Sequence, residues 1–168
     1  MLEQLSARRM ARLVGYIPQR SGISIDISVL DVVLMGFNPR LGLLERPGRK
    51  MQDLAVQALE QVGLGGREQS NYLCLSEGQK QLCILARTLV SGSRLLLLDE
   101  PAAGMNPSET AELMENIRRI RDTFQIAILL IEHDMNLVMG ICEGICVLNY
   151  GKVIAKGSPA DILSLIHI

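Results

Sequence analysis

The 168-residue sequence has few aromatic residues and almost no net charge. Aromatic residues make up 3% of the chain, with no tryptophan, two phenylalanines and three tyrosines, and the formal net charge is −1. Proteins that bind single-stranded nucleic acid stack bases on aromatic side chains, and duplex-binding proteins carry a strongly basic face. Both classes are disfavoured, so we expect no nucleic-acid partner and a core filled by aliphatic side chains.

The sequence also lacks a cysteine framework and long apolar runs. Its four cysteines, expected in apolar or helical settings, are Cys74, Cys83, Cys142 and Cys146. No further cysteine or histidine pair lies beside the last two, so a zinc site is disfavoured. The longest apolar runs, 95–98 and 126–131, are too short to cross a bilayer, and charged residues interrupt any leader-like run near the N-terminus. These features predict a soluble, cytosolic protein in a reducing compartment.

What the sequence does contain is an alternation of apolar runs and helical patterns over the length of one domain. Short apolar runs typical of buried parallel strands occur at 14–18, 95–98 and 126–131. Apolar spacing predicts helices over 29–35, 51–62, 76–90 and 106–124, a hairpin over 145–149 and 152–155, and a helical turn from Ser158. Strands alternating with helices predict an α/β fold with a largely parallel sheet.

Charged side chains follow two of these strands. Asp99 and Glu100 end the leucine run, and His133 follows the next strand. Open α/β sheets bind ligands at the carboxyl ends of their strands, where Asp99 could hold Mg²⁺ and Glu100 could polarise an attacking water. The alternatives are that Asp-Glu-Pro is only a turn, and that His133 only begins a helix.

A third feature is the segment LSEGQ at 75–79, which opens a predicted helix. Ser76 and Gly78 would there combine free backbone N–H groups, the helix dipole and a hydroxyl into an anion site. The alternative is that Ser76 is an ordinary N-cap, which the same residues would serve equally well.

Together these segments resemble the nucleotide-binding subunit of ATP-binding cassette (ABC) transporters over nearly the whole chain. The matching elements are the signature motif (75–79, with Glu77 where glycine is commoner), the Walker B strand (95–100), the Q-loop glutamine (Gln19), the switch histidine (His133) and the D-loop (102–106). The resemblance implies a P-loop NTPase-like fold, with a helical subdomain over about 20–91 and part of the core over 92–162. Residues 163–168 resemble a non-native tail more than family sequence.

The resemblance also implies roles at a site for ATP and Mg²⁺. Gln19 would contact Mg²⁺ or the attacking water, Asp99 would bind Mg²⁺, Glu100 would be the catalytic base and His133 would hold the γ-phosphate. Ser76, Gly78 and Gln79 would bind the γ-phosphate of ATP held by the opposite subunit of a head-to-tail dimer. The D-loop residues are Ala103, Gly104 and Asn106, and the last stands where many members of the family have aspartate.

One element of the family is missing from the sequence. The phosphate-cradling Walker A pattern G-x-x-x-x-G-K-[ST] does not occur, and Gly151–Lys152 lacks the upstream glycine. In the family this loop precedes the Q-loop, and here eighteen residues precede Gln19. The resemblance therefore implies a domain truncated before the Q-loop, with a gap between the strand at 126–131 and the strand at 145–149. We expect such a chain to bind ATP weakly or not at all, and to be inactive as an ATPase when alone.

The two parts of the chain resemble different branches of the family. Residues 14–98 are similar to importer ATPases for iron–siderophore, haem or cobalamin, and the part from Asp99 onward is similar to ATPases of branched-chain amino-acid importers. The change falls at LLLLDEP, a stretch that most of the family shares, which suggests a mosaic of two genes. The cargo therefore stays open between a metal chelate and a branched-chain amino acid.

The resemblance favours a bacterial importer ATPase subunit at the inner face of the plasma membrane. Its partners would be transmembrane permease subunits, docked on the segment between Gln19 and Ser76 near Leu41, Leu43 and Leu44, and a second nucleotide-binding subunit. Two alternatives stay open: a DNA-repair, chromosome-maintenance or translation ATPase, and a binding module that supplies its signature motif to a partner's ATP site.

Overall fold

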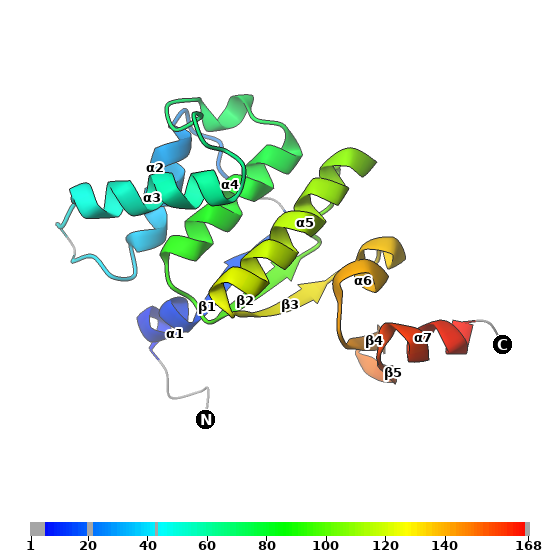
Figure 1. Ribbon diagram of the computed structural model, residues 1–168. Helices are drawn as coiled ribbons and strands as arrows, with labels where there is room; N and C mark the ends of the chain where they lie inside the picture. The colour runs from blue at the N-terminus through cyan, green and yellow to red at the C-terminus, as the bar shows by residue number, and fades with distance from the viewer. Residues whose placement is uncertain (1–5, 20–21, 43, 167–168) are drawn as a thin grey trace. The chain divides into compact units, whose positions relative to one another are not determined.

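The computed structural model describes residues 6–19, 22–42 and 44–166 (Figure 1). The chain divides into two compact units, Met1–Ile131 and Glu132–Ile168. Among the described residues, no helix combines the length and apolar character that crossing a membrane requires.

The first unit contains a parallel three-stranded sheet in the order β1-β2-β3. Its strands are β1 (Val14–Ile17), β2 (Leu95–Asp99) and β3 (Ala127–Ile131). Val14 of β1 pairs with Leu95, and Leu95 pairs with Ala127. Because all three strands run the same way, the residues that follow them meet at one edge of the sheet. This confirms the predicted α/β fold.

Three helices form the apolar body beside the sheet. These are α2 (Val29–Leu34), α3 (Arg49–Gln61) and α4 (Glu77–Val90), which pack against one another, and α2 continues into the 3₁₀ helix η2 (Met35–Phe37). A second 3₁₀ helix, η3 (Tyr72–Cys74), precedes α4. Their contacts are made by aliphatic side chains such as Val32, Leu59 and Ile84, all buried. The expected aliphatic core is confirmed, with Phe37 and Tyr72 as its buried aromatic residues.

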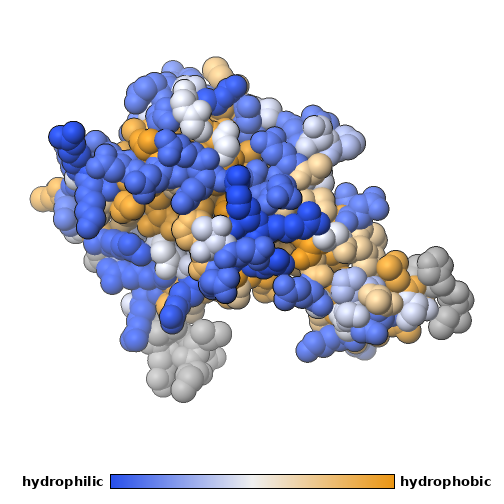
Figure 2. Space-filling view, in the orientation of Figure 1, coloured by the Kyte–Doolittle hydropathy of each residue, from blue (hydrophilic) through white to orange (hydrophobic). Residues whose placement is uncertain are grey.

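Helix α5 (Pro107–Phe124) passes in front of the strands in Figure 1. It begins with a capping box, in which the Asn106 side chain accepts from the Glu109 N–H (3.0 Å) and the Glu109 carboxylate accepts from the Asn106 N–H (3.1 Å). Leu113, Ile117 and Ile120 are buried along one side. Figure 2 shows hydrophilic side chains along the opposite, outward side. The predicted cap and amphipathic helix are both confirmed.

The second unit consists of two helices and a hairpin. They are α6 (Met135–Ile141), β4 (Ile145–Asn149), β5 (Lys152–Gly157) and α7 (Pro159–Ile166). The two strands pair antiparallel through a turn at Tyr150 and Gly151, as predicted. Helix α7 continues into the segment from 163 onward, while His167 and the last residue lie outside the described part of the chain.

Strand β3 lies at the edge of the three-stranded sheet. Within the described residues, β4 pairs with β5 and not with β3, which therefore ends the three-stranded sheet. Parallel strands are normally covered on both faces and paired on both sides, yet Leu129 and Ile131 of β3 are half exposed. Strand β3 is thus an edge strand with an exposed apolar face, and the missing strand that the resemblance implied stays a prediction.

Three local expectations were wrong or incomplete. Leu41 was expected on an exposed docking loop, but it is buried (7% exposed) because the turn after η2 folds it against the helices. Leu43 lies outside the described residues. Cys146 was expected in an apolar or helical setting, but it lies exposed in β4, and Cys74 is exposed in η3. The short helix α1 (Ala7–Leu13) was not expected, and α6 was expected only in the alternative that His133 begins a helix.

The contact between η2 and α4 leaves no space for a side chain at Gly36. A β-carbon there would overlap the carbonyl oxygen of Arg87 and lie 2.6 Å from Val90 Cγ2. A backbone oxygen inside a helix cannot move aside, so we expect Gly36→Ala to lower the free energy of unfolding by about 2 kcal/mol. Urea unfolding measures this. Gly42→Ala is the matched control, because its β-carbon would meet only ordinary contacts at 3.5 Å or more; equal stability of the two variants would refute this packing.

Candidate functional site

The carboxyl ends of β1 and β2 bring the first group of predicted residues together. Gln19 follows β1, and its Nε2 donates to Glu100 Oε2 at 2.6 Å. Asp99 is the last residue of β2, and Glu100 follows it directly. The structure therefore places Gln19, Asp99 and Glu100 at one edge of the sheet, where the strand end predicted Asp99 and Glu100.

Backbone geometry fixes the position of Glu100. Its φ angle of 43° lies in the left-handed region, which few residues other than glycine adopt. Its N–H donates to the carbonyl of Ile131 on β3 (2.9 Å), and its carbonyl accepts from the Ala103 N–H (3.1 Å). The chain thus turns sharply at Glu100 while remaining bonded to the sheet. Such strained positions persist where the surrounding structure holds them, and they are common at functional sites.

Tyr16 is a neighbour of Asp99 that the sequence analysis missed. Its hydroxyl donates to Asp99 Oδ2 at 2.9 Å, across the β1–β2 pair. This hydrogen bond to the carboxylate raises the pKa of Tyr16 above its usual value. The signal was present in the alternation of β1, since Tyr16 lies between two buried residues, Gly15 and Ile17, and so must project from the other face.

The donor set at this edge suits a hard cation. Asp99, Glu100 and Gln19 offer carboxylate and amide oxygens, which are the ligands that Mg²⁺ prefers. The described residues contain no cluster of three or more His, Cys, Asp or Glu side chains. The residues present therefore fit an ion that keeps water and phosphate oxygens in most of its coordination sphere, as Mg²⁺ usually does.

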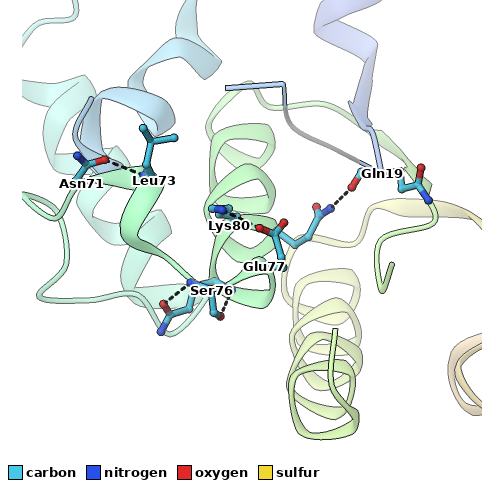
Figure 3. A network of polar contacts seen from close by, with 8 residues as sticks. Gln19, Asn71, Leu73, Ser76, Glu77 and Lys80 are labelled. Carbon is cyan, nitrogen blue, oxygen red and sulfur yellow. Dashed lines mark hydrogen bonds and ion pairs between the residues drawn. The ribbon is translucent and has the colours of Figure 1, made fainter. Parts of the chain in front are cut away.

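The signature residues form the first turn of α4. The Ser76 hydroxyl accepts from the Gln79 N–H (3.3 Å), and the Gln79 side chain accepts from the Ser76 N–H (3.2 Å), which completes a capping box (Figure 3). Glu77 and Lys80 form an ion pair at 2.7 Å on the outer side of this turn. Ser76 is thus an N-cap, as the alternative proposed, and the geometry leaves the anion-binding role open because a cap and an anion site use the same end of the helix.

Glu109 joins the first turn of α4 to the start of α5. A β-carbon at Gly78 would lie 3.1–3.2 Å from three carbons of the Glu109 side chain, so the two helix ends are in close contact. Hydrogen bonds from Ser76 first, and then from the backbone of Asn106 and Gly78, lower the pKa of Glu109. A carboxylate at the N-termini of two helices is stabilised by both dipoles.

The D-loop residues form the turn between β2 and α5. Gly104 has a φ of 78°, a conformation that glycine adopts without strain, and Asn106 is the N-cap of α5. Ala103 bonds back to Glu100. The three predicted D-loop residues therefore lie between two parts of the site. Asp99 and Glu100 precede them in the chain, and Glu109, which contacts the first turn of α4, follows them.

His133 belongs to the second unit. Its side chain is 79% exposed, with Nδ1 3.7 Å from Glu132 Oε2, and its backbone N–H donates to the same oxygen (3.1 Å). The following residue, Asp134, caps α6 by accepting from the N–H groups of Asn136 and Leu137. His133 thus lies just before a helix, as one alternative supposed, with its imidazole available to solvent.

A hollow of about 320 Å³ lies elsewhere in the first unit. It is lined by residues that precede β2 and β3, among them Ser93, Arg94 and Gln125. These residues mark the amino-terminal edge of the sheet, opposite Glu100. This hollow is therefore separate from the edge that carries Gln19, Asp99 and Glu100.

Comparison with known proteins gives a consistent result. The sequence pattern of the family described as ABC transporter matches residues 2–103. The manganese transport system ATP-binding protein MntB of Listeria monocytogenes is 38% identical over 146 residues, which are 86% of this chain and 60% of MntB. The high-affinity branched-chain amino acid transport ATP-binding protein LivG of Escherichia coli is 39% identical in an alignment of 176 positions, gaps included, that covers 96% of this chain and 68% of LivG.

A third relative and two solved structures show the same partial coverage. The hemin import ATP-binding protein HmuV of Bordetella pertussis is 34% identical, covering 99% of this chain and 66% of HmuV. A metal-chelate-type ABC transporter in an inward-facing conformation matches with a TM-score of 0.84 and 27% identity, covering 90% of this chain and 60% of that one. CbiO1 of Clostridium perfringens, part of the transporter complex cbiONQ, matches with a TM-score of 0.81 and 27% identity, covering 91% and 60%.

Proposed function

This chain belongs to the ABC transporter family, and we propose that it carries two parts of a bacterial importer's ATPase subunit. One is the hydrolytic edge, formed by Gln19, Asp99 and Glu100. The other is the signature face, formed by Ser76, Gly78 and Gln79. The chain spans about 60% of the length of MntB and of the two matching solved structures. The relatives named above are ATP-binding proteins of manganese transport, branched-chain amino-acid transport and hemin import. Coupling of ATP hydrolysis to uptake is the function that these relatives and the site together support.

The 2.6 Å contact between Gln19 and Glu100 at the end of β2 carries this proposal. In the proposed reaction, the Glu100 carboxylate accepts a proton from the attacking water, and Gln19 orients that water beside Glu100. Asp99 is the residue that would hold Mg²⁺, whose chemistry is to neutralise charge on the phosphate oxygens. His133 donates a hydrogen bond to the γ-phosphate.

The signature face would act on ATP bound by a second nucleotide-binding subunit. Ser76 and Gly78 lie at the N-terminus of a 14-residue helix, whose dipole favours a phosphate. Both would bind the phosphate after releasing the Glu109 carboxylate. The Gln79 side chain accepts a hydrogen bond from the Ser76 N–H in the free chain, and it would contact the phosphate after releasing that bond. A head-to-tail dimer would bring this face against the partner's γ-phosphate.

Permease subunits would dock on the segment between Gln19 and Ser76. Leu44 is 96% exposed there, which fits a contact with an apolar partner surface, whereas Leu41 is buried and is not part of it. Such docking would hold the chain at the inner face of the plasma membrane. The relatives serve manganese, hemin and branched-chain amino-acid transport, which supports the proposal that the cargo is a metal chelate or a branched-chain amino acid.

A second candidate function is supply of the signature motif alone. The observation that favours it is an intact signature turn in a sequence that contains no Walker A pattern. In that case the partner subunit would bind the nucleotide and perform the chemistry, while Ser76 and Gly78 would complete the partner's site.

Association with a complete ABC importer ATPase subunit tests the signature face. We expect the two proteins to elute together in size-exclusion chromatography when ATP is present, and separately without it. Ser76→Asp keeps an N-cap but places negative charge where the phosphate would bind, so it should weaken association about tenfold. Ser76→Asn is the matched control, because asparagine caps a helix without that charge. Association independent of ATP, or equal association of both variants, would contradict the proposal.

A further inference from the structure

Gln81 is a buried polar side chain on the apolar side of α4. It is 8% exposed, and its neighbours one turn further along the helix, Ile84 and Leu85, are fully buried. Its Nε2 lies 3.1 Å from the carbonyl oxygen of Gln19 and 3.5 Å from that of Pro18. Figure 3 shows Gln19 beside α4, joined by a dashed line to a side chain of this helix.

The amide orientation of Gln81 follows from its partners. Both neighbours are carbonyl oxygens, which can only accept, so the NH₂ group must face them. These carbonyls lie just beyond the sheet, because the pairing of β1 with β2 ends at Ile17 and Leu98. Gln81 therefore hydrogen-bonds to backbone carbonyls that follow the last residue of β1 paired in the sheet.

The held segment carries Gln19, which bonds at its other end to Glu100. Glu100 is fixed to the sheet through its own backbone bond to Ile131. Gln19 is thus tied to α4 through its backbone and to the sheet edge through its side chain. A displacement of α4 relative to the sheet would move the backbone of Gln19 with it.

The remaining polar atom of Gln81 indicates that this residue does not serve stability alone. Its Oε1 is buried and has no hydrogen-bond partner among the described residues. An unmet buried acceptor costs stability, and an apolar side chain of similar length would avoid that cost. Gln19 itself is exposed, so its carbonyl could take water in place of Gln81.

We propose that Gln81 is a positioning residue that couples the signature helix α4 to Gln19, and through Gln19 to Glu100. This inference rests on the proposed function, because it links the signature face to the hydrolytic edge. Gln81 transmits a movement of α4 to the backbone of Gln19. When α4 moves relative to the sheet, the Gln19 side chain approaches or leaves the Glu100 carboxylate.

Glutamine-selective ¹⁵N NMR of the full chain tests this coupling without any ATPase assay. We expect Gln81→Met to make hydrogen exchange of the Gln19 side-chain amide about fivefold faster, with an unchanged urea midpoint and unchanged signals from glutamines on α3. Gln52→Met is the control, since Gln52 is exposed on α3. Gln81→Glu, which turns an acceptor toward the two carbonyls, should release Gln19 further.

Two results would overturn the proposal. One is an unchanged Gln19 side-chain amide in Gln81→Met. The other is a lowered urea midpoint with faster exchange throughout α4, which would show that Gln81 only stabilises the fold. Because the readout requires no nucleotide, a failure here is distinguishable from a failure of ATP-dependent association, which tests the proposed function itself.

Discussion

Titrated with Mg-ATP in a calorimeter, the purified chain is expected to bind about 1,000-fold more weakly than a complete ABC ATPase subunit under the same conditions. The Walker A pattern supplies several backbone N–H groups and a lysine to the phosphates, and the sequence contains no such pattern. A hydrogen bond to a charged group contributes about 1.5–3 kcal/mol, so losing three of them removes at least about 4 kcal/mol.

The residues that remain cannot replace this cradle. Asp99 and Glu100 are carboxylates, which repel phosphate unless a cation lies between them, and the Glu109 carboxylate lies at the signature turn. A control titration with Mg-AMP should give the same negligible heat as Mg-ATP. Micromolar binding of ATP, with a preference over AMP, would show that the chain has a phosphate site outside the motifs considered above.

Reaction with an aromatic disulfide reagent is expected to distinguish Cys83 from the exposed Cys74 and Cys146. Cys83 is fully buried, its Sγ donates to the Val29 carbonyl at 3.8 Å, and burial raises its pKa to about 12. The thiolate is the reacting species, and a pKa raised from 9.0 to about 12 leaves roughly 1,000-fold less of it at pH 8. Exposed Cys74 and Cys146 should therefore react within minutes, and Cys83 should not.

The pH dependence follows from the same shift. The folded pKa of Cys83 is raised above the value of 9.0 for an ordinary thiol, so the group favours the folded state below pH 9 and ceases to do so as the pH rises toward 12. Its labelling rate should still be rising tenfold per pH unit at pH 10. Cys83→Ser removes the slow reaction and serves as the control. Equal labelling of Cys83 and Cys74 would mean that α4 does not pack on α2 as described.

The sheet and its reactive edge could be predicted because their sequence signals are local. The four leucines before Asp99 are a continuous apolar run, and open α/β sheets bind ligands at the carboxyl ends of their strands, so Asp99 and Glu100 were expected at that edge. Gln19 was expected at the site from the resemblance. The cap of α5 was predictable for a similar reason: Asn106 and Glu109 stand at the spacing of a capping box.

Contacts between elements distant in sequence were not predictable in the same way. Tyr16 and Asp99 are joined across two strands, and Gln81 reaches Gln19 from a helix 62 residues away. A signal for Gln81 did exist, since a glutamine on the apolar side of α4 required a polar partner. Helix α1 was missed, and α6 was named only as an alternative, because each has seven residues, too few to show an apolar period. Leu41 was misplaced because a loop composition does not show which side chain folds inward.

Hydrolysis by a mixed pair of subunits tests the central claim that this chain retains a working signature face. A complete importer ATPase subunit whose own signature serine is replaced by aspartate should be inactive alone. Addition of this chain should restore ATP hydrolysis, because the partner would bind the nucleotide and Ser76 and Gly78 would complete that site. Ser76→Asp in this chain should abolish the restored activity, and Ser76→Asn should retain most of it. Activity that stays at the level of the disabled subunit alone would contradict the account.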